Sequence, residues 1–141
     1  MSGRPVLRLL DANANRALEG LRVCEDICRF HLEAAQSYRH LRALRHAVAA
    51  AVRALPVSPL ELVRARESGR DVGRRAPAGR TPSLERVLLV NFQRSKEALR
   101  TLEECARLVS PKHTATFQRL RFRAYDLERD TLIRLAALRH R

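Results

Sequence analysis

The chain has 141 residues, the length of one ordinary domain, which excludes a multidomain enzyme. Lys and Arg number 28 against 15 Asp and Glu, a formal charge of +13, and 45% of the residues are hydrophobic, which excludes an intrinsically disordered chain. Leu, Ala and Arg supply 22, 20 and 26 residues, and because all three favour helices the composition also argues against an all-β fold. We expect one all-α domain over residues 1–141.

Two long helices are predicted at the start of the chain. Pro5 suits a first helical position, and apolar residues at alternating steps of three and four predict a helix over about 5–32. After a weak break near Glu33, a second apolar stripe predicts a helix over about 36–55, which ends before Pro56 because proline disfavours helical geometry in the preceding residue. The stripes are Leu7, Leu10, Ala14, Ala17, Leu21, Cys24 and Cys28, then Tyr38, Leu41, Leu44, Val48, Val52 and Leu55.

A short helix and a long loop follow this first hairpin. Ser58, Pro59 and Glu61 have the pattern of a capping box, which predicts a short helix to about Arg66. Residues 67–80 are rich in Gly and Arg, which predicts a solvated, irregular loop.

Two more helices are predicted after the loop. Thr81-Pro82 predicts the start of a helix over about 82–109, and Ser110-Pro111 that of a last helix over about 111–138. The apolar stripe of the first of these is Leu88, Phe92, Leu99, Leu102 and Ala106.

The two halves of the chain resemble each other at an offset of 78 residues, and the similarity includes polar positions. The matched polar pairs are Asn13 with Asn91, Arg16 with Arg94, Glu19 with Glu97, Arg22 with Arg100, Glu25 with Glu103, Asp26 with Glu104 and Arg29 with Arg107. Each copy precedes a helix with a Leu-Arg pair, Leu41-Arg42 and Leu120-Arg121. The pattern predicts a four-helix bundle made of a duplicated helical hairpin, with repeats at about 5–55 and 82–138.

The shared polar residues allow two interpretations. Asn competes for backbone hydrogen bonds and is a poor helix former, so Asn13 and Asn91 at matching mid-helix positions need a reason. One interpretation is an inherited solvated face with weak ion pairs. The other is a pseudo-symmetric polar site between the first and third long helices, where arginines bind phosphate groups and carboxylates bind a divalent cation.

Other features of the sequence bear on a metal site, on nucleic-acid binding and on the cellular compartment. Cys24, Cys28 and His31 share a helical face at a spacing that suits metal ligands, but no fourth ligand is evident, which favours small core residues. The charge suits a nucleic-acid-binding bundle, whereas the alternation of arginines with acids and the few aromatic residues argue against one. The absence of a transmembrane-length apolar run, of an apolar signal region and of a disulfide framework predicts a cytoplasmic protein without a membrane partner.

Four segments carry a resemblance to a known family. They are LLDANANRALEGLRVCEDICRF at 9–30, RARESGRDVG at 64–73, SLERVLLVNFQRSKEALRTLEECARL at 83–108 and LRFRAYDLE at 120–128. Together they resemble the alternative hydroxymethylpyrimidine phosphate kinase family of thiamin biosynthesis, which also occurs fused ahead of thiamin phosphate synthase. The resemblance covers roughly residues 8–132 and implies a free-standing kinase domain or a fragment of such a fusion.

The resemblance implies a kinase that moves the γ-phosphoryl group of ATP to the phosphate of 4-amino-5-hydroxymethyl-2-methylpyrimidine phosphate, with Mg²⁺. Transfer between two polyanions depends mostly on positioning and on neutralising charges, and an ionised acceptor phosphate needs no strong general base. The competing classes are a nucleic-acid-binding module and a non-catalytic assembly domain for thiamin phosphate synthase. Formation of a homo-oligomer stays open.

The resemblance and the duplication together imply a set of site residues. The expected catalytic residues are Asp11, Arg16, Glu19, Arg94 and Glu97. The expected substrate- and phosphate-binding residues are Asn13, Asn15, Arg22, Arg66, Asp71, Asn91, Arg100 and Arg121, and the metal candidates are Glu25 and Glu103. Loop 67–80 is expected to close over the phosphates, against the alternative of a plain connector. Two positions depart from the family: Arg107 replaces a usual Lys, and Pro77-Ala78-Gly79 precede Arg80 where an acid is expected.

Overall fold

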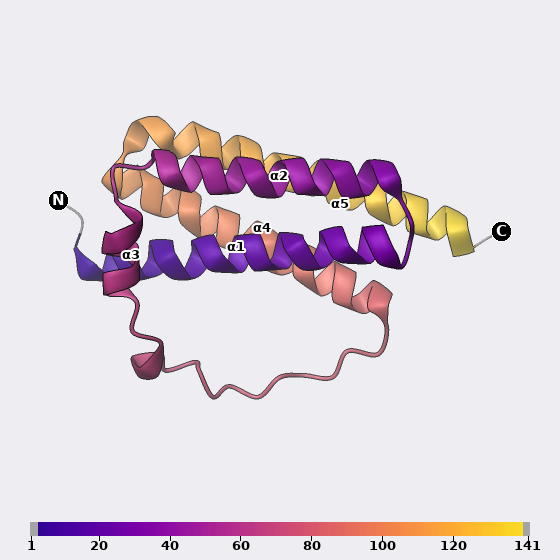
Figure 1. Ribbon diagram of the computed structural model, residues 1–141, viewed down its shortest axis with the longest axis horizontal. Coiled ribbons are helices and arrows are strands. Elements are labelled where there is room, and N and C mark those ends of the chain that lie inside the picture. Colours follow the sequence, from indigo (N-terminus) through magenta and orange to yellow (C-terminus); the bar gives the residue numbers. More distant parts are fainter. Residues whose placement is uncertain (1–2, 140–141) are drawn as a thin grey trace.

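The computed structural model describes residues 3–139, and it is built of helices (Figure 1). The α-helices are α1 (Arg4–Phe30), α2 (Ala35–Ala54), α3 (Pro59–Ala65), α4 (Leu84–Val109) and α5 (Thr114–Arg139), and short 3-10 turns cover Ser68–Arg70 and Pro111–His113. No strand occurs within residues 3–139, so the all-α class is confirmed. The ends of the expected domain, residues 1–2 and 140–141, lie outside the described part.

The four long helices lie side by side. α1 packs against α2 and α4, α5 packs against α4 and α2, and the short α3 packs against α1. The long loop runs from the end of α3 to the start of α4 at the opposite end of α1 (Figure 1). The packing therefore brings α1 and α4, which carry the matched polar residues, into direct contact. The duplication itself stays an interpretation of the sequence.

The core is made of the predicted apolar stripes. From Leu10 to Cys28 the stripe of α1 is buried, and Leu41, Leu44 and Val48 of α2 are fully buried with it. The stripe of α4 is also fully buried, and it consists of Leu88, Phe92, Leu99, Leu102 and Ala106. α5 adds Phe117, Leu120, Ala124 and Leu135. Since burial of each Leu, Val or Phe side chain contributes roughly 1.5–3 kcal/mol, these stripes determine which helix faces meet.

The start of the third long helix differs from the prediction. α4 begins at Leu84 and not at Pro82, because the Ser83 hydroxyl accepts a hydrogen bond from the backbone amide of Arg86 at 3.1 Å and caps the helix. α5 likewise begins at Thr114, because residues 111–113 form a 3-10 turn. The capping box at Ser58 is confirmed, with both reciprocal hydrogen bonds at 3.1 Å.

No single helix within residues 3–139 is long and apolar enough to cross a membrane. α2 taken together with residues 59–70 reaches the required length and composition, but the two parts are bent by 89° at their junction.

The chain turns between α1 and α2 at Glu33, whose φ of 50° is the one positive value among the non-glycine residues described. The left-handed region costs an L-residue about 1 kcal/mol because Cβ approaches the carbonyl oxygen, and glycine avoids that contact. We therefore expect Glu33→Gly to raise the Tm by roughly 3 °C in a thermal unfolding experiment. The control is Glu33→Ala, which keeps the Cβ and is expected to give no gain, and a lower Tm for the glycine variant would contradict the left-handed turn.

Candidate functional site

A groove lies where α1 and α4 cross, and residues of both helices line it. Its volume is about 430 Å³, within the range of small-molecule sites. The lining of this central groove consists of Asn13, Arg16, Glu19, Gly20, Asn91, Arg94, Glu97, Ala98 and Thr101. The structure thus brings six expected site residues together, and they form three pairs of equivalent positions from the two halves.

Two small residues set the close approach of α1 and α4. The Ser95 hydroxyl donates a hydrogen bond to the backbone carbonyl of Ala17 at 3.3 Å. A Cβ on Gly20 would lie 2.3 Å from the Ser95 Oγ and 3.0 Å from the backbone oxygen of Asn91. Glycine is therefore required at this point of the crossing. Sequence reasoning missed both residues, although the mid-helix glycine in an otherwise strong helix was a usable signal.

We expect Gly20→Ala to lower the free energy of unfolding by about 1 kcal/mol. The overpacking cost of about 1–3 kcal/mol exceeds the gain in helix propensity of nearly 1 kcal/mol, and the forced separation would displace both walls of the central groove. Denaturant unfolding measures the loss of stability. Gly79→Ala is the matched control, because a Cβ on Gly79 meets nothing within 4 Å. Unchanged stability of the Gly20 variant would contradict this crossing.

The paired asparagines have a structural role in the walls of the central groove. The Asn13 side-chain amide donates to the backbone carbonyl of Leu9 at 2.9 Å, and Asn91 donates to Val87 at 2.8 Å. These equivalent bonds hold each side chain against its own helix and leave the amide oxygen as an acceptor. Each asparagine is therefore a fixed polar group at the α1–α4 contact.

Four charged side chains in the central groove have no partner within the part of the chain that is described. Arg16, Arg94, Glu19 and Glu97 are all exposed, and no ion pair joins any of them to another residue. Most other carboxylates within residues 3–139 form ion pairs, as Glu25, Glu103 and Glu128 do. Arginines and carboxylates that are not committed to each other remain available to a phosphate group and to a cation.

Two further grooves flank the central groove. The first flanking groove, between α1 and α2, has a volume of about 660 Å³ and is lined by Leu18, Glu19, Arg22, Val23, Arg45, His46, Ala49 and Arg53. The second flanking groove, between α4 and α5, has a volume of about 410 Å³ and is lined by Gln93, Lys96, Glu97, Arg100, Arg121 and Tyr125. Glu19 and Glu97 also line the central groove. Each carboxylate therefore lies where one flanking groove meets the central groove.

Glu25 and Glu103, the metal candidates, are each held by an arginine. Both carboxylates are almost fully buried, and Arg45 Nε and Arg121 Nε donate to them at 2.7 and 2.8 Å. These hydrogen bonds raise the pKa of Arg45 and of Arg121 above the ordinary value. No cluster of three or more His, Cys, Asp or Glu suited to a metal ion occurs among residues 3–139. Both carboxylates thus act as acceptors in buried ion pairs.

Asp11 lies apart from the central groove, in a contact with the start of the long loop. Arg66 Nε and Nη2 donate to its two carboxylate oxygens at 2.7 Å each, a bidentate pair. The Asn15 side chain donates to the Asp11 backbone oxygen at 3.0 Å. The hydrogen bonds to Asp11 raise the pKa of Arg66. Asp11 and Arg66 therefore fasten the loop to α1.

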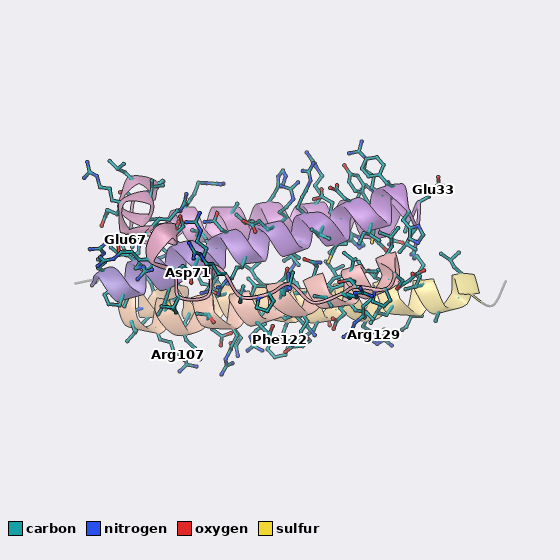
Figure 2. The ribbon with its side chains drawn as sticks, turned by 90° about the horizontal axis from the view of Figure 1, so that it is seen from below. Glu33, Glu67, Asp71, Arg107, Phe122 and Arg129 are labelled. Carbon is teal, nitrogen blue, oxygen red and sulfur yellow. The ribbon has the colours of Figure 1, made fainter. Side chains whose placement is uncertain are left out.

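Within the described chain, no residue of the long loop lines the central groove. Residues 68–84 are exposed, and Glu67 and Asp71 mark its beginning where it is seen from below (Figure 2). The Asp71 carboxylate accepts a hydrogen bond from the backbone amide of Gly73 at 2.8 Å, which stabilises a local turn. The solvated, irregular loop is confirmed, and its closure over phosphates stays a prediction.

The cysteines belong to the core, as the sequence favoured. Cys24, Cys28 and Cys105 are buried and free, and burial raises the pKa of the Cys28 thiol to about 11. Burial also raises the pKa of Cys24. His31 is exposed immediately after the end of α1, with Nε2 3.6 Å from Glu85 Oε1. A thiol that stays protonated near neutral pH is a poor metal ligand and a poor nucleophile.

Comparisons with known proteins give a family match and a set of curated relatives. A model described as the ThiD2 family matches residues 8–130. Similar proteins named thiamine-phosphate synthase occur in Synechocystis sp., 39% identical over 126 residues and 87% of this chain, and in Rhodopirellula baltica, 34% identical over 141 residues and 98% of this chain. That of Gloeobacter violaceus is 39% identical over 142 residues and 95% of this chain.

The similarity covers only part of each relative. The matched region is 35%, 37% and 40% of the three synthases, so this chain spans little more than a third of their length. No solved structure matches the chain.

Proposed function

The chain belongs to the ThiD2 family, and on this premise we propose that it is an ATP- and Mg²⁺-dependent kinase that converts hydroxymethylpyrimidine phosphate to the diphosphate in thiamin biosynthesis. The family match and the relatives confirm the resemblance to a domain of thiamin biosynthesis. Kinase activity, ATP and Mg²⁺ are predictions.

The observation that carries the proposal is the central groove with its two equivalent sets of unpaired charges. Arg16 and Arg94 each present a planar fork of donors that fits phosphate oxygens, and no carboxylate competes for either fork in the described chain. A reaction between two phosphate-bearing substrates needs cations from more than one direction. Two arginines from different helices at one groove meet this need.

In the proposed reaction the acceptor phosphate oxygen attacks the γ-phosphorus of ATP, and the bond between that phosphorus and the β–γ bridging oxygen breaks to release ADP. Arg16 and Arg94 hold the two phosphate groups against their mutual repulsion. Asn13 and Asn91, fixed by their bonds to Leu9 and Val87, offer oriented polar groups. No protein base is needed, because the acceptor is ionised near neutral pH.

Glu19 and Glu97 are the residues that would hold Mg²⁺. Both are exposed, unpaired carboxylates at the groove that holds the arginines, and oxygen ligands suit a hard divalent cation. Mg²⁺ usually binds through one or two carboxylates together with substrate phosphates and waters, so two carboxylates suffice. When bound, the ion neutralises phosphate charge during transfer.

The test is incubation of the purified protein with ATP, Mg²⁺ and hydroxymethylpyrimidine phosphate, with chromatography of the products. The proposal expects the pyrimidine diphosphate and ADP in equal amounts, and none of either without the pyrimidine. Diphosphate formation should stop when EDTA removes the metal. Absence of diphosphate under saturating substrates would refute the kinase.

The second candidate is a non-catalytic assembly domain for thiamin phosphate synthase. It is favoured by one observation: the similar proteins carry that name, and this chain matches only about a third of each. A stable complex with the synthase in size-exclusion chromatography, together with no turnover, would support this candidate. Steeply salt-dependent binding to duplex DNA without turnover would instead support the nucleic-acid module.

A further inference from the structure

We propose that the nucleoside triphosphate occupies the first flanking groove, between α1 and α2, with its phosphates directed to the central groove past Glu19. This inference rests on the proposed function and assigns the nucleotide to one half of the molecule. The proposal excludes the second flanking groove, between α4 and α5, as the nucleotide site. Several residues that line the two grooves occupy matching positions in the two halves of the sequence. The assignment therefore depends on the differences between the two linings.

The first difference is room and apolar surface. The first flanking groove is about 660 Å³ against about 410 Å³ for the second. Leu18, Val23 and Ala49 give the first groove a half-buried apolar lining, whereas the lining of the second contains no aliphatic residue. At the position of Leu18 the second half has Lys96. A nucleoside needs apolar surface for its base and sugar, and the first groove supplies it.

The second difference is the availability of positive charge. In the second flanking groove Lys96 is bound to Glu128 and Arg121 to Glu103, both at 2.8 Å, and Arg100 lies 3.4 Å from Glu103 and Glu104. Every cation of that groove already faces a carboxylate. A polyanion entering there would have to displace these ion pairs or bind beside their negative charge.

The first flanking groove contains an arginine that forms no ion pair with any described residue. Arg45 is bound to Glu25 at 2.7 Å and Arg22 lies 3.5 Å from Asp26, but Arg53 is exposed and forms no ion pair with any described residue. His46 stands beside it in the lining without a carboxylate partner in the same part of the chain. Because a triphosphate is more negative than a monophosphate, the groove with the uncommitted arginine suits the nucleotide.

The third observation is continuity. Glu19 lines both the first flanking groove and the central groove, so the two grooves meet at this side chain. On α1, residues 11, 15, 18 and 22 recur at helical spacing and share one face. The Asp11–Arg66 pair therefore lies on the face that leads into the first groove, which places the start of the long loop on the same side.

Calorimetry with a non-hydrolysable ATP analogue and Mg²⁺ tests the assignment without turnover. Arg53→Ala is expected to weaken binding of the analogue on the order of tenfold, since one charge-assisted contact is lost. Arg100→Ala, in the second flanking groove, is expected to leave that affinity within twofold. Arg123→Ala is the matched control, because Arg123 is exposed on α5 and lines no groove, so it removes the same charge elsewhere.

The outcomes separate this inference from the proposed function. Weakening by Arg53→Ala alone supports the assignment, even if the protein forms no diphosphate and the kinase proposal fails. Weakening by Arg100→Ala in place of Arg53→Ala overturns the assignment, while diphosphate formation by the wild-type protein would keep the kinase. Equal weakening by Arg53→Ala and Arg123→Ala also overturns it, because the effect would then come from the overall charge. No binding of the analogue to the wild-type protein overturns it as well.

Discussion

Arg121→Met is expected to lower the free energy of unfolding by about 3 kcal/mol. Arg121 Nε lies 2.8 Å from Glu103 Oε1, and the exposed fractions of the two side chains are 11% and 2%. Removing the arginine leaves a buried carboxylate whose nearest cation, Arg100, is at 3.4 Å. Breaking a buried pair typically costs about 3–5 kcal/mol because the remaining charge is uncompensated. Urea denaturation at pH 7 measures the loss.

A double variant identifies the cause of that loss. Arg121→Met combined with Glu103→Gln removes both charges, and a neutral pair of similar volume is often no less stable than a buried ion pair. We expect the double variant to recover more than half of the stability lost in Arg121→Met. Arg123→Met, on an exposed position of α5, is expected to stay within about 0.5 kcal/mol of the wild type. A double variant no better than the single one would contradict the charge explanation.

The sequence was sufficient to predict the helices and most of the core. The stripes that contain Leu21, Leu44 and Leu99 are buried as expected, because a period of 3.6 residues fixes which face of a helix is apolar. The predicted helix ends were less accurate. Ser83 and not Thr81 caps α4, and the choice between two neighbouring capping residues depends on local geometry that periodicity does not contain.

The sequence predicted the site residues that occupy matched positions in the two halves. It did not predict which residues of neighbouring helices lie opposite each other. Asn13, Arg16 and Glu19 line one groove with their partners from the second half. Arg42, which the Leu-Arg comparison matches with Arg121, is exposed, and Arg45 is the residue that binds Glu25. Which arginine reaches a carboxylate on the neighbouring helix is set by the turn between α1 and α2, and a one-dimensional pattern does not specify that turn.

The same limit applies to Asp11 and Arg66. Their types suited catalysis and phosphate binding, but they lie 55 residues apart and the structure joins them to each other. Position 89, which matches Asp11 in the second half, is a leucine. Matched positions therefore do not mark every polar residue that the structure uses. Asp11 is bound to Arg66, and its expected catalytic role stays a prediction.

Arg16→Lys and Arg94→Lys are each expected to lower kcat/KM for diphosphate formation on the order of 10- to 100-fold. Lysine keeps the charge but loses the planar two-donor fork that binds phosphate, and one lost charge-assisted hydrogen bond costs about 1.5–3 kcal/mol. Both arginines are exposed and form no ion pair among residues 3–139, so the Tm is expected to change by less than about 1 °C. Steady-state kinetics with each substrate varied in turn measures the effect.

The pattern of the two variants tests whether the central groove is the site of transfer. If both arginines hold phosphates during the reaction, kcat falls in each variant. If the nucleotide also occupies the first flanking groove, as proposed, the KM for ATP and the KM for the pyrimidine phosphate respond differently in the two variants. Arg123→Lys, which lines no groove, is expected to leave both parameters within twofold. If Arg16→Lys and Arg94→Lys also stay within twofold, the matched residues are a solvated face and the reaction takes place elsewhere on the molecule.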